Sequence, residues 1–491
     1  MQQNLEQNKD EIIKKSLIIA GSAMIVGLAF NYLFFSKEVG ISLLLFVLVL
    51  LISVYFLAYY FKKDLRYPWL LVPIAFFAVM PSIRANLLLT VLNILAIIGL
   101  ILITTRVLTG ENLKEFRFVQ YLFTFFVLPF GILYRSATTL WTLVGGTKVV
   151  ISERFSRYLK GALIALPVLI VFALLLSSAD LAFNQLLQNT FSISISEQTI
   201  AKIVWLGIIS IGSIGVLATV FIKPINPKLK IVHPSEPLKT PSIEVGMFLG
   251  LVAGLFGVFI IFQISYLFGG VINISNSDFT YAEYARKGFW ELLVVSISVL
   301  AILLAIDSFT ERIQNRLRWF VVPSTIIVLE VIIMIISAFK RLMLYQSTYG
   351  LTTLRMYVAA FIILLGVIFV MMIGKLFSKK VNLFFWTGLL LSLIAFIGVM
   401  NLINPDAIIA HNQVQRFSET GKIDSFYLSG LSTDSLPVLI DFYSQAHTED
   451  KAIFDSTFNE IKIDLEQKSK NWQSFNLSRA KALKLLNDFH P

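Results

Sequence analysis

The sequence has no cysteine and few charged residues. Asp, Glu, Lys and Arg make up 14% of its 491 residues, whereas a soluble globular domain carries about 25%. The missing cysteines exclude disulfides, thiolate metal sites and a cysteine nucleophile. The scarcity of charge, together with a hydrophobic share of 57%, excludes a soluble enzyme, a disordered chain and a fibrous protein, because so much apolar surface could not be hidden from water.

Catalytic and nucleotide-binding signatures are also missing. There is no HExxH zinc motif and no GxSxG nucleophile motif. The segment Gly145-Gly146-Thr147-Lys148 lacks the upstream glycine of a Walker phosphate loop. The four histidines are widely spaced and suggest no metal site. The sequence therefore predicts no cofactor and no metal.

What the sequence has instead is a series of long apolar segments. A transmembrane helix needs about 20 predominantly apolar residues. The eleven clear candidates are 16–35, 39–61, 67–82, 86–105, 158–178, 201–222, 244–269, 288–306, 319–339, 352–374 and 381–403. Two weaker segments, 118–134 and 137–151, are expected to cross the membrane together or not at all. The pattern predicts an all-α polytopic bundle of 11–13 spans that forms a transmembrane domain over residues 1–403.

The basic residues predict how this bundle is oriented. With the N-terminus in the cytoplasm and an odd number of spans, 24 Lys and Arg residues fall in cytoplasmic loops and six in external loops. This asymmetry follows the positive-inside rule, and it explains the net charge of +11 without a nucleic-acid partner. We therefore expect the N-terminus inside, the C-terminus outside, and the segment at 16–35 to be an uncleaved first span.

Residues 404–491 differ from the rest of the chain. They hold 12 acidic and nine basic residues and show helical periodicity in four stretches. These stretches are 406–417, 433–446, 449–466 and 476–489. Gly421 and Gly430 interrupt the pattern, and Ser432 is a candidate N-cap. We predict a small α-helical tail outside the membrane.

Two features inside the apolar segments need an explanation. Glu330 lies mid-segment, where an insertion scale assigns a carboxylate a cost of roughly 2.5–3.5 kcal/mol. It either couples proton or cation movement, contacts a substrate, or forms a neutral hydrogen bond to another helix. Gly246, Gly250 and Gly254 form a GxxxGxxxG stripe that we expect to pack a neighbouring helix, so that Gly250→Leu should destabilise the bundle. Asn93 is expected to bridge helices.

Three polar stretches lie at the predicted external ends of segments. They are 281–291, 345–355 and 404–412. Tyr349 fits an ordinary interface anchor. Glu291 and Arg355 each enter an apolar run from the same side, so we predict that they meet there. Arg286 would join them in one polar site beneath Asp406, at the start of the tail. Alternatively, Arg355 snorkels to the lipid headgroups.

The same stretches resemble a known family. They contain Tyr-Ala-x-x-Ala-Arg-Lys-Gly-Phe-Trp-Glu-Leu from Tyr281, Tyr-Gly-Leu-Thr-x-x-Arg from Tyr349 and Asn-Pro-Asp-Ala from Asn404. With the tail segment 423–437, these motifs resemble bacterial membrane proteins grouped as domain of unknown function 4153/4173. The resemblance extends over about residues 240–440. It implies a polytopic inner-membrane protein and supplies no activity.

Two classes of function remain open. A transporter or flippase-like protein, which would bind a small molecule or a lipid, is supported by Glu330, the glycine stripe and the proline-broken segments. A non-catalytic scaffold or sensor would instead use the external tail to bind a protein partner. The sequence favours the first class, because intramembrane carboxylates are usually functional. A membrane-embedded transferase using Asp278, Glu283 and Glu291 has no DxD motif to support it, so an enzyme is less favoured.

Overall fold

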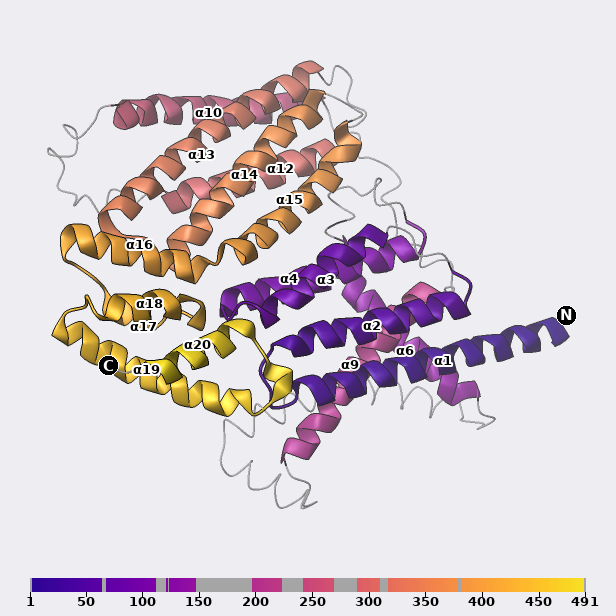
Figure 1. Ribbon diagram of the computed structural model, residues 1–491. Helices are drawn as coiled ribbons and strands as arrows, with labels where there is room; N and C mark the ends of the chain where they lie inside the picture. The colour runs from indigo at the N-terminus through magenta and orange to yellow at the C-terminus, as the bar shows by residue number, and fades with distance from the viewer. Residues whose placement is uncertain are drawn as a thin grey trace, which may run out of the picture. The chain divides into compact units, whose positions relative to one another are not determined.

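A computed structural model describes residues 2–63, 68–111, 121, 123–146, 197–222, 242–268, 289–309, 317–377 and 381–489. All regular structure in these ranges is helical, which confirms the all-α prediction (Figure 1). The chain forms two compact units. Unit 1 comprises Met1–Phe35 and Ile132–Ile222, and unit 2 comprises Ser36–Gly131 and Lys223–Pro491.

Within the described ranges, eight helices are long and apolar enough to cross a membrane. They are Glu11–Phe34, Ile41–Tyr60, Leu87–Leu108, Ala201–Phe221, Glu244–Ile261, Trp319–Tyr349, Thr353–Phe377 and Phe385–Ile403. Two shorter apolar helices occupy Pro68–Ser82 and Leu292–Asp307. The protein is therefore a multi-pass membrane protein. The predicted span at 158–178 lies outside the described residues.

The described part of the two weak apolar segments, residues 123–146, is one continuous helical stretch. η4 (Phe123–Val127) leads into α6 (Leu128–Gly146), which passes without a break through residues 134–137. α6 is not among the eight apolar helices. How often the chain crosses the membrane between 118 and 151 stays a prediction.

The helices of unit 1 approach one another closely at glycine residues. It contains α1 (Gln2–Phe34), α6 from Ile132 and α9 (Glu197–Phe221). A Cβ atom on Gly27 of α1 would overlap Ser210 of α9, and one on Gly215 of α9 would overlap α6. Ser136 adds a hydrogen bond from its hydroxyl to the Ile211 carbonyl, at 2.7 Å. Small residues allow such close contact between membrane helices.

Unit 2 contains the other helices of the membrane-spanning part. They are α2 (Ile41–Tyr60), η1 (Pro68–Leu70), α3 (Leu71–Val79), η2 (Met80–Ser82), α4 (Leu87–Leu108), α10 (Ser242–Phe268), α12 (Phe289–Phe309), η7 (Leu317–Val321), α13 (Val322–Tyr349), α14 (Thr353–Phe377) and α15 (Val381–Ile403). Helices α10 and α12–α15 share an apolar core around Leu303, Val328, Phe369 and Phe385. α13 continues beyond its predicted end at 339, so Tyr349 ends a helix rather than lying in a loop.

The tail folds into the predicted helices. It contains α16 (Pro405–Thr420), α17 (Ser425–Ser429), η8 (Thr433–Ser435), α18 (Leu436–Tyr443), α19 (Thr448–Ser469), η9 (Trp472–Ser474) and α20 (Leu477–Asp488). Its core includes Phe442, Phe454 and Phe458, with Phe442 and Phe454 edge to face and Phe454 and Phe458 stacked. Gly421 ends α16 at a φ of 67°, a left-handed conformation that favours glycine.

The tail also belongs to unit 2 and contacts one end of its helices, which we call the tail end (Figure 1). The loops before α2 and α4, the α13–α14 turn and the end of α15 all lie at this end, as the hydrogen bonds below specify. The predicted topology places these segments together on the external side. In the structure these segments lie together at the tail end. That the tail end is on the external side of the membrane stays a prediction.

Candidate functional site

Among the predicted site residues whose side chains the structure describes, Asp406 is the most deeply buried, with 2% of its surface exposed. It lies in the first turn of α16. Its Oδ2 accepts hydrogen bonds from the Asn86 side-chain amide at 2.9 Å and from the Ser432 backbone N–H at 3.1 Å. Asn86 also caps α4 by accepting from the Leu89 N–H. Asp406 Oδ1 has no hydrogen-bond partner among the described residues. This carboxylate therefore joins the start of α4 to the tail.

Asp434 lies beside Asp406; it belongs to the tail motif at 423–437, but the sequence did not predict it as a site residue. The Ser432 hydroxyl donates to Asp434 Oδ2 at 3.4 Å, and the Ala85 N–H donates to the same oxygen at 2.9 Å. Burial raises the pKa of Asp434, and the charge of Asp406 raises it further. Hydrogen bonds and the Arg84 charge oppose this shift, and the pKa remains above its ordinary value.

Backbone carbonyls anchor the loop before α4. The Asn476 side-chain amide donates to the carbonyls of Pro81 and Arg84, each at 2.8 Å. The Arg84 guanidinium donates in turn to the carbonyls of Asn401 and Leu402, at 2.8 and 3.0 Å. Carbonyls in the last turn of a helix have no partner within it, so Arg84 satisfies the end of α15.

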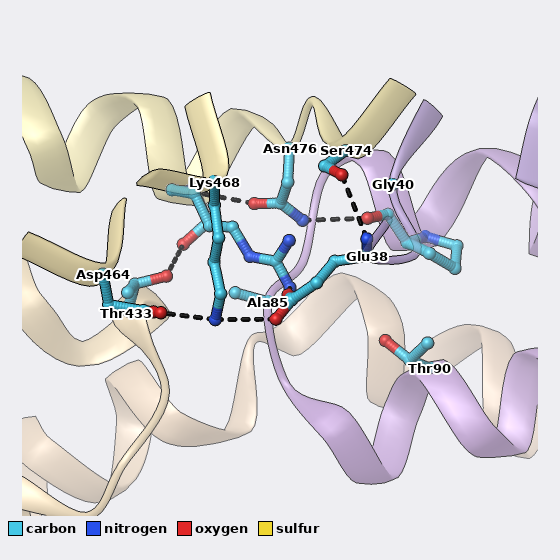
Figure 2. Close-up of polar contacts among 12 residues, drawn as sticks. Glu38, Gly40, Ala85, Thr90, Thr433, Asp464, Lys468, Ser474 and Asn476 are labelled. Atoms are coloured by element: carbon cyan, nitrogen blue, oxygen red, sulfur yellow. Dashed lines mark hydrogen bonds and ion pairs between the residues drawn. The ribbon is translucent and has the colours of Figure 1, made fainter. Parts of the chain in front are cut away.

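The loop before α2 is held by a cluster of ion pairs, shown in Figure 2. The Glu38 carboxylate lies 2.7 Å from Lys468 Nζ and 2.6 Å from an Arg479 guanidinium nitrogen. Lys468 also pairs with Asp464, at 2.7 Å. The Glu38 N–H donates to the Ser474 hydroxyl at 3.0 Å. Burial lowers the pKa of Lys468, but the bonds to its two carboxylates outweigh burial and leave it raised.

Two tail contacts reach the first residues of membrane helices. The Ile41 N–H donates to the Phe475 carbonyl at 2.9 Å. A Cβ atom on Gly40 would overlap that carbonyl, so glycine permits this approach. The Tyr427 hydroxyl accepts from the Thr353 N–H at 2.7 Å. Since Ile41 begins α2 and Thr353 begins α14, the tail contacts the ends of two spans directly.

Arg355 folds back over the turn between α13 and α14. Its guanidinium lies 4.1 Å from the centroid of the Tyr345 ring and donates to the carbonyls of Tyr349 and Gly350. Gly350 has a φ of 76° and ends α13. Arg355 and Tyr349 therefore lie together, and the guanidinium satisfies carbonyls at the end of α13.

The other predicted members of this rim cannot be placed beside Arg355. Arg286 lies outside the described residues. Glu291 lies in α12, but its side chain is likewise outside them. A shared site of these three residues stays a prediction.

Glu330 lies in α13 and faces α10. Its Oε1 would be 3.2 Å from a Cβ atom on Gly257, so glycine makes room for the carboxyl group. Its Oε2 is buried without a hydrogen-bond partner among the described residues. The expected hydrogen bond to another helix is therefore not made by this oxygen within the described part of the chain.

The three glycines of the predicted stripe do not share one contact. A Cβ atom on Gly246 would overlap the Trp319 ring, whereas one on Gly250 or Gly254 would meet no described atom within 4 Å. The buried apolar positions of α10 are Leu249, Ala253 and Ile260. At 3.6 residues per turn, each four-residue step drifts by about 40° around the helix, so a strict stripe leaves the contact face. Among the described residues, close packing of the stripe is found at Gly246.

Asn93 bridges helices as expected. Its side-chain amide and that of Asn401 exchange two hydrogen bonds, at 2.9 and 2.8 Å, between α4 and α15. Both residues are buried.

Buried ion pairs occupy the opposite end of unit 2, where α4, α12 and α14 finish. Lys375 Nζ lies 2.6 Å from Asp307, and the two side chains are 2% and 7% exposed. The same ammonium lies 4.7 Å from the centroid of the Trp386 ring. Arg106, also buried, pairs with Glu111. No sequence pattern marks these residues, because a charged residue near the end of an apolar segment is ordinary.

Elsewhere in the described ranges, no group of three or more His, Cys, Asp or Glu side chains is placed to hold a metal ion. The tail carries a groove between α19 and α20. It is lined by Asp455, Phe458, Asn459, Lys462, Leu486 and Phe489.

Comparison with known proteins identifies the family. The model of the family described as Domain of unknown function (DUF4153) matches residues 71–442. This range runs from α3 to α18, and it reaches much nearer the N-terminus than the motifs quoted above. Neither a curated protein nor a solved structure matches the chain. Because the match covers most of the sequence, this multi-pass membrane protein belongs to the DUF4153 family.

Proposed function

We propose that this protein is a scaffold or sensor of the bacterial inner membrane, with the tail as its external binding module. The observation that carries this proposal is the attachment of the tail to the loops before α2 and α4 and to the start of α14. A loosely tethered binding domain would not need these contacts. The proposal reverses the preference for transport that the sequence alone suggested.

The energetics of the tail end support a coupled role. Withdrawing a partner from a buried polar group costs about 1–3 kcal/mol. Asp406 and Asn476 each hold two such partners, so the tail and the helix ends should move as one body. A partner that prefers one arrangement of the tail would therefore bias the helices attached to it.

The groove between α19 and α20 is the proposed binding surface. Phe489 is the partly exposed apolar residue of the groove and packs on the buried Phe458 and Leu486. The polar side chains of Asp455, Asn459 and Lys462 lie beside it. An apolar centre with polar surroundings is typical of protein-protein contacts. The partner would be a segment of another protein.

Photo-crosslinking in cells tests this proposal. A photoreactive amino acid at Asn459, in the groove, should give a discrete protein adduct. The same amino acid at Lys470, an exposed residue outside the groove, should not. Adducts from both positions, or none from Asn459, would contradict it. Reporter fusions at Lys239 and after Pro491 should give opposite signals, and equal signals would mean that the predicted parity of the spans is wrong.

Transport is a second candidate, favoured by Glu330. A buried carboxyl oxygen without a partner among the described residues suits a group that exchanges a proton. Purified protein in vesicles should then dissipate a pH gradient, and Glu330→Gln should abolish this flux. A wild-type protein that leaves the gradient intact would remove this candidate.

A further inference from the structure

The tail exposes large aromatic side chains although it has an apolar core of its own. Phe426 is 82% exposed, Trp472 52% and Phe475 48%. A large apolar side chain left in water loses the favourable free energy that its burial would give. Such side chains call for an apolar surface that covers them.

The position of these aromatics is set by the two contacts with span ends. Phe475 accepts a hydrogen bond from Ile41, the first residue of α2. Phe426 adjoins Tyr427, which binds the first residue of α14. Trp472 belongs to η9, the turn that Figure 2 shows packed against the loop before α2. The three aromatics therefore belong to two tail segments, and each of these segments contacts the first residue of an apolar helix.

The chemistry of the membrane surface fits aromatic side chains. The boundary between headgroups and acyl chains favours Trp and Tyr, whose rings are apolar and whose polar atoms remain near water. Lys470, exposed and two residues before Trp472, supplies an ammonium group for lipid phosphate. A protein partner would have to approach within the plane of the lipid headgroups to cover the same residues.

We propose that the tail lies on the lipid surface, with Phe426, Trp472 and Phe475 inserted among the headgroups beside α14 and α2. The tail is then held in two ways, by its hydrogen bonds to the helix ends and by its contact with the bilayer. This contact is separate from the α19–α20 groove and does not depend on a protein partner.

The absence of native cysteine allows a direct test. Phe426→Cys, Trp472→Cys and Phe475→Cys are each labelled with an environment-sensitive fluorophore. The full-length variants are reconstituted in vesicles of phosphatidylethanolamine and phosphatidylglycerol that carry a nitroxide on the acyl chain near the glycerol. Asn459→Cys, exposed in the groove, is the matched control.

Fluorophores at the three aromatic positions should emit at shorter wavelength, and the nitroxide should quench most of their fluorescence. The fluorophore at Asn459→Cys should be quenched little. Absence of quenching at the three positions would overturn the proposal, and so would equal quenching at Asn459→Cys. A blue shift at the three positions that appears only after another protein is added would also overturn the proposal. Phe426 is so exposed that its replacement should leave the melting temperature in detergent unchanged, so this variant tests the proposal even if the others misfold.

Discussion

The two ends of unit 2 are stabilised in different ways. At the tail end, hydrogen bonds join residues that are far apart in sequence: Ala85 and Asp434 are 349 positions apart, and Arg84 and Asn476 are 392 apart. At the opposite end, Lys375 and Asp307 form a buried ion pair, and Arg106 pairs with Glu111, only five positions away. The tail end thus spreads its stability over many hydrogen bonds and partly exposed ion pairs, whereas the Lys375–Asp307 pair at the opposite end is almost fully desolvated.

The largest expected effect is at the opposite end. Lys375→Met leaves the Asp307 carboxylate buried without its cation, which should cost about 3–5 kcal/mol of folding free energy. Thermal unfolding in detergent measures the loss. The double variant Lys375→Met/Asp307→Leu should recover much of it, because no lone charge remains. If the double variant is as unstable as the single one, charge burial is not what distinguishes this end.

At the tail end, Asp406→Ala should have the next largest effect. It leaves the Asn86 amide and the Ser432 N–H without their acceptor, at about 1–3 kcal/mol for each buried donor. Limited proteolysis should then cleave the tail faster. Glu419→Ala, an exposed acidic residue of the same helix, is the control and should match the wild type. Unchanged cleavage of Asp406→Ala would mean that the carboxylate does not tie the tail to α4.

The third prediction compares two glycines of α10, Gly246, which lies against Trp319, and Gly250, which does not. Gly246→Leu forces a side chain into the Trp319 ring, and overpacking of this kind costs about 1–3 kcal/mol. Gly250→Leu should change the melting temperature little, because a side chain there meets open space among the described residues. Equal destabilisation by both would show that the four-residue stripe is the contact face after all.

The smallest expected effect is a pH dependence at Asp434. Its pKa in the folded protein lies above the ordinary 3.8, so the folded state holds more protons than the unfolded state in the window above 3.8. Its contribution to stability should therefore rise as the pH falls through the raised pKa towards 3.8. Melting temperatures across this range should show the rise as a difference between wild type and Asp434→Asn. A difference that does not vary with pH would contradict it.

The sequence predicted the helices better than their contacts. Apolar length and periodicity located the spans and all the longer tail helices, because both patterns are local. The predicted span 319–339 ends before the basic residues Lys340 and Arg341, yet α13 continues to Tyr349. Hydropathy marks where a membrane ends, whereas the helix continues until Gly350 terminates it.

The candidate site was only partly predictable, because burial depends on which distant segment covers a residue. Asp406 stood out through a motif at the start of the tail. Asp434 also belongs to a motif, in the segment 423–437, but an acid in a turn is usually solvated, so its burial could not be predicted. Glu38 looked like an ordinary loop acid, and Lys375 like an interfacial cation. Their roles follow from the packing of segments that are far apart in the sequence, which neither periodicity nor spacing encodes.

The amide pair between Asn93 and Asn401 has a consequence for how the protein is made. The two residues are 308 positions apart, so a ribosome adding roughly 5–20 residues per second takes about 15–60 s to supply the second amide. During that interval α4 is in the bilayer with a polar side chain that lacks its final partner. An insertion factor that shields such helices, or a temporary amide partner from another span, would protect the nascent chain until α15 arrives.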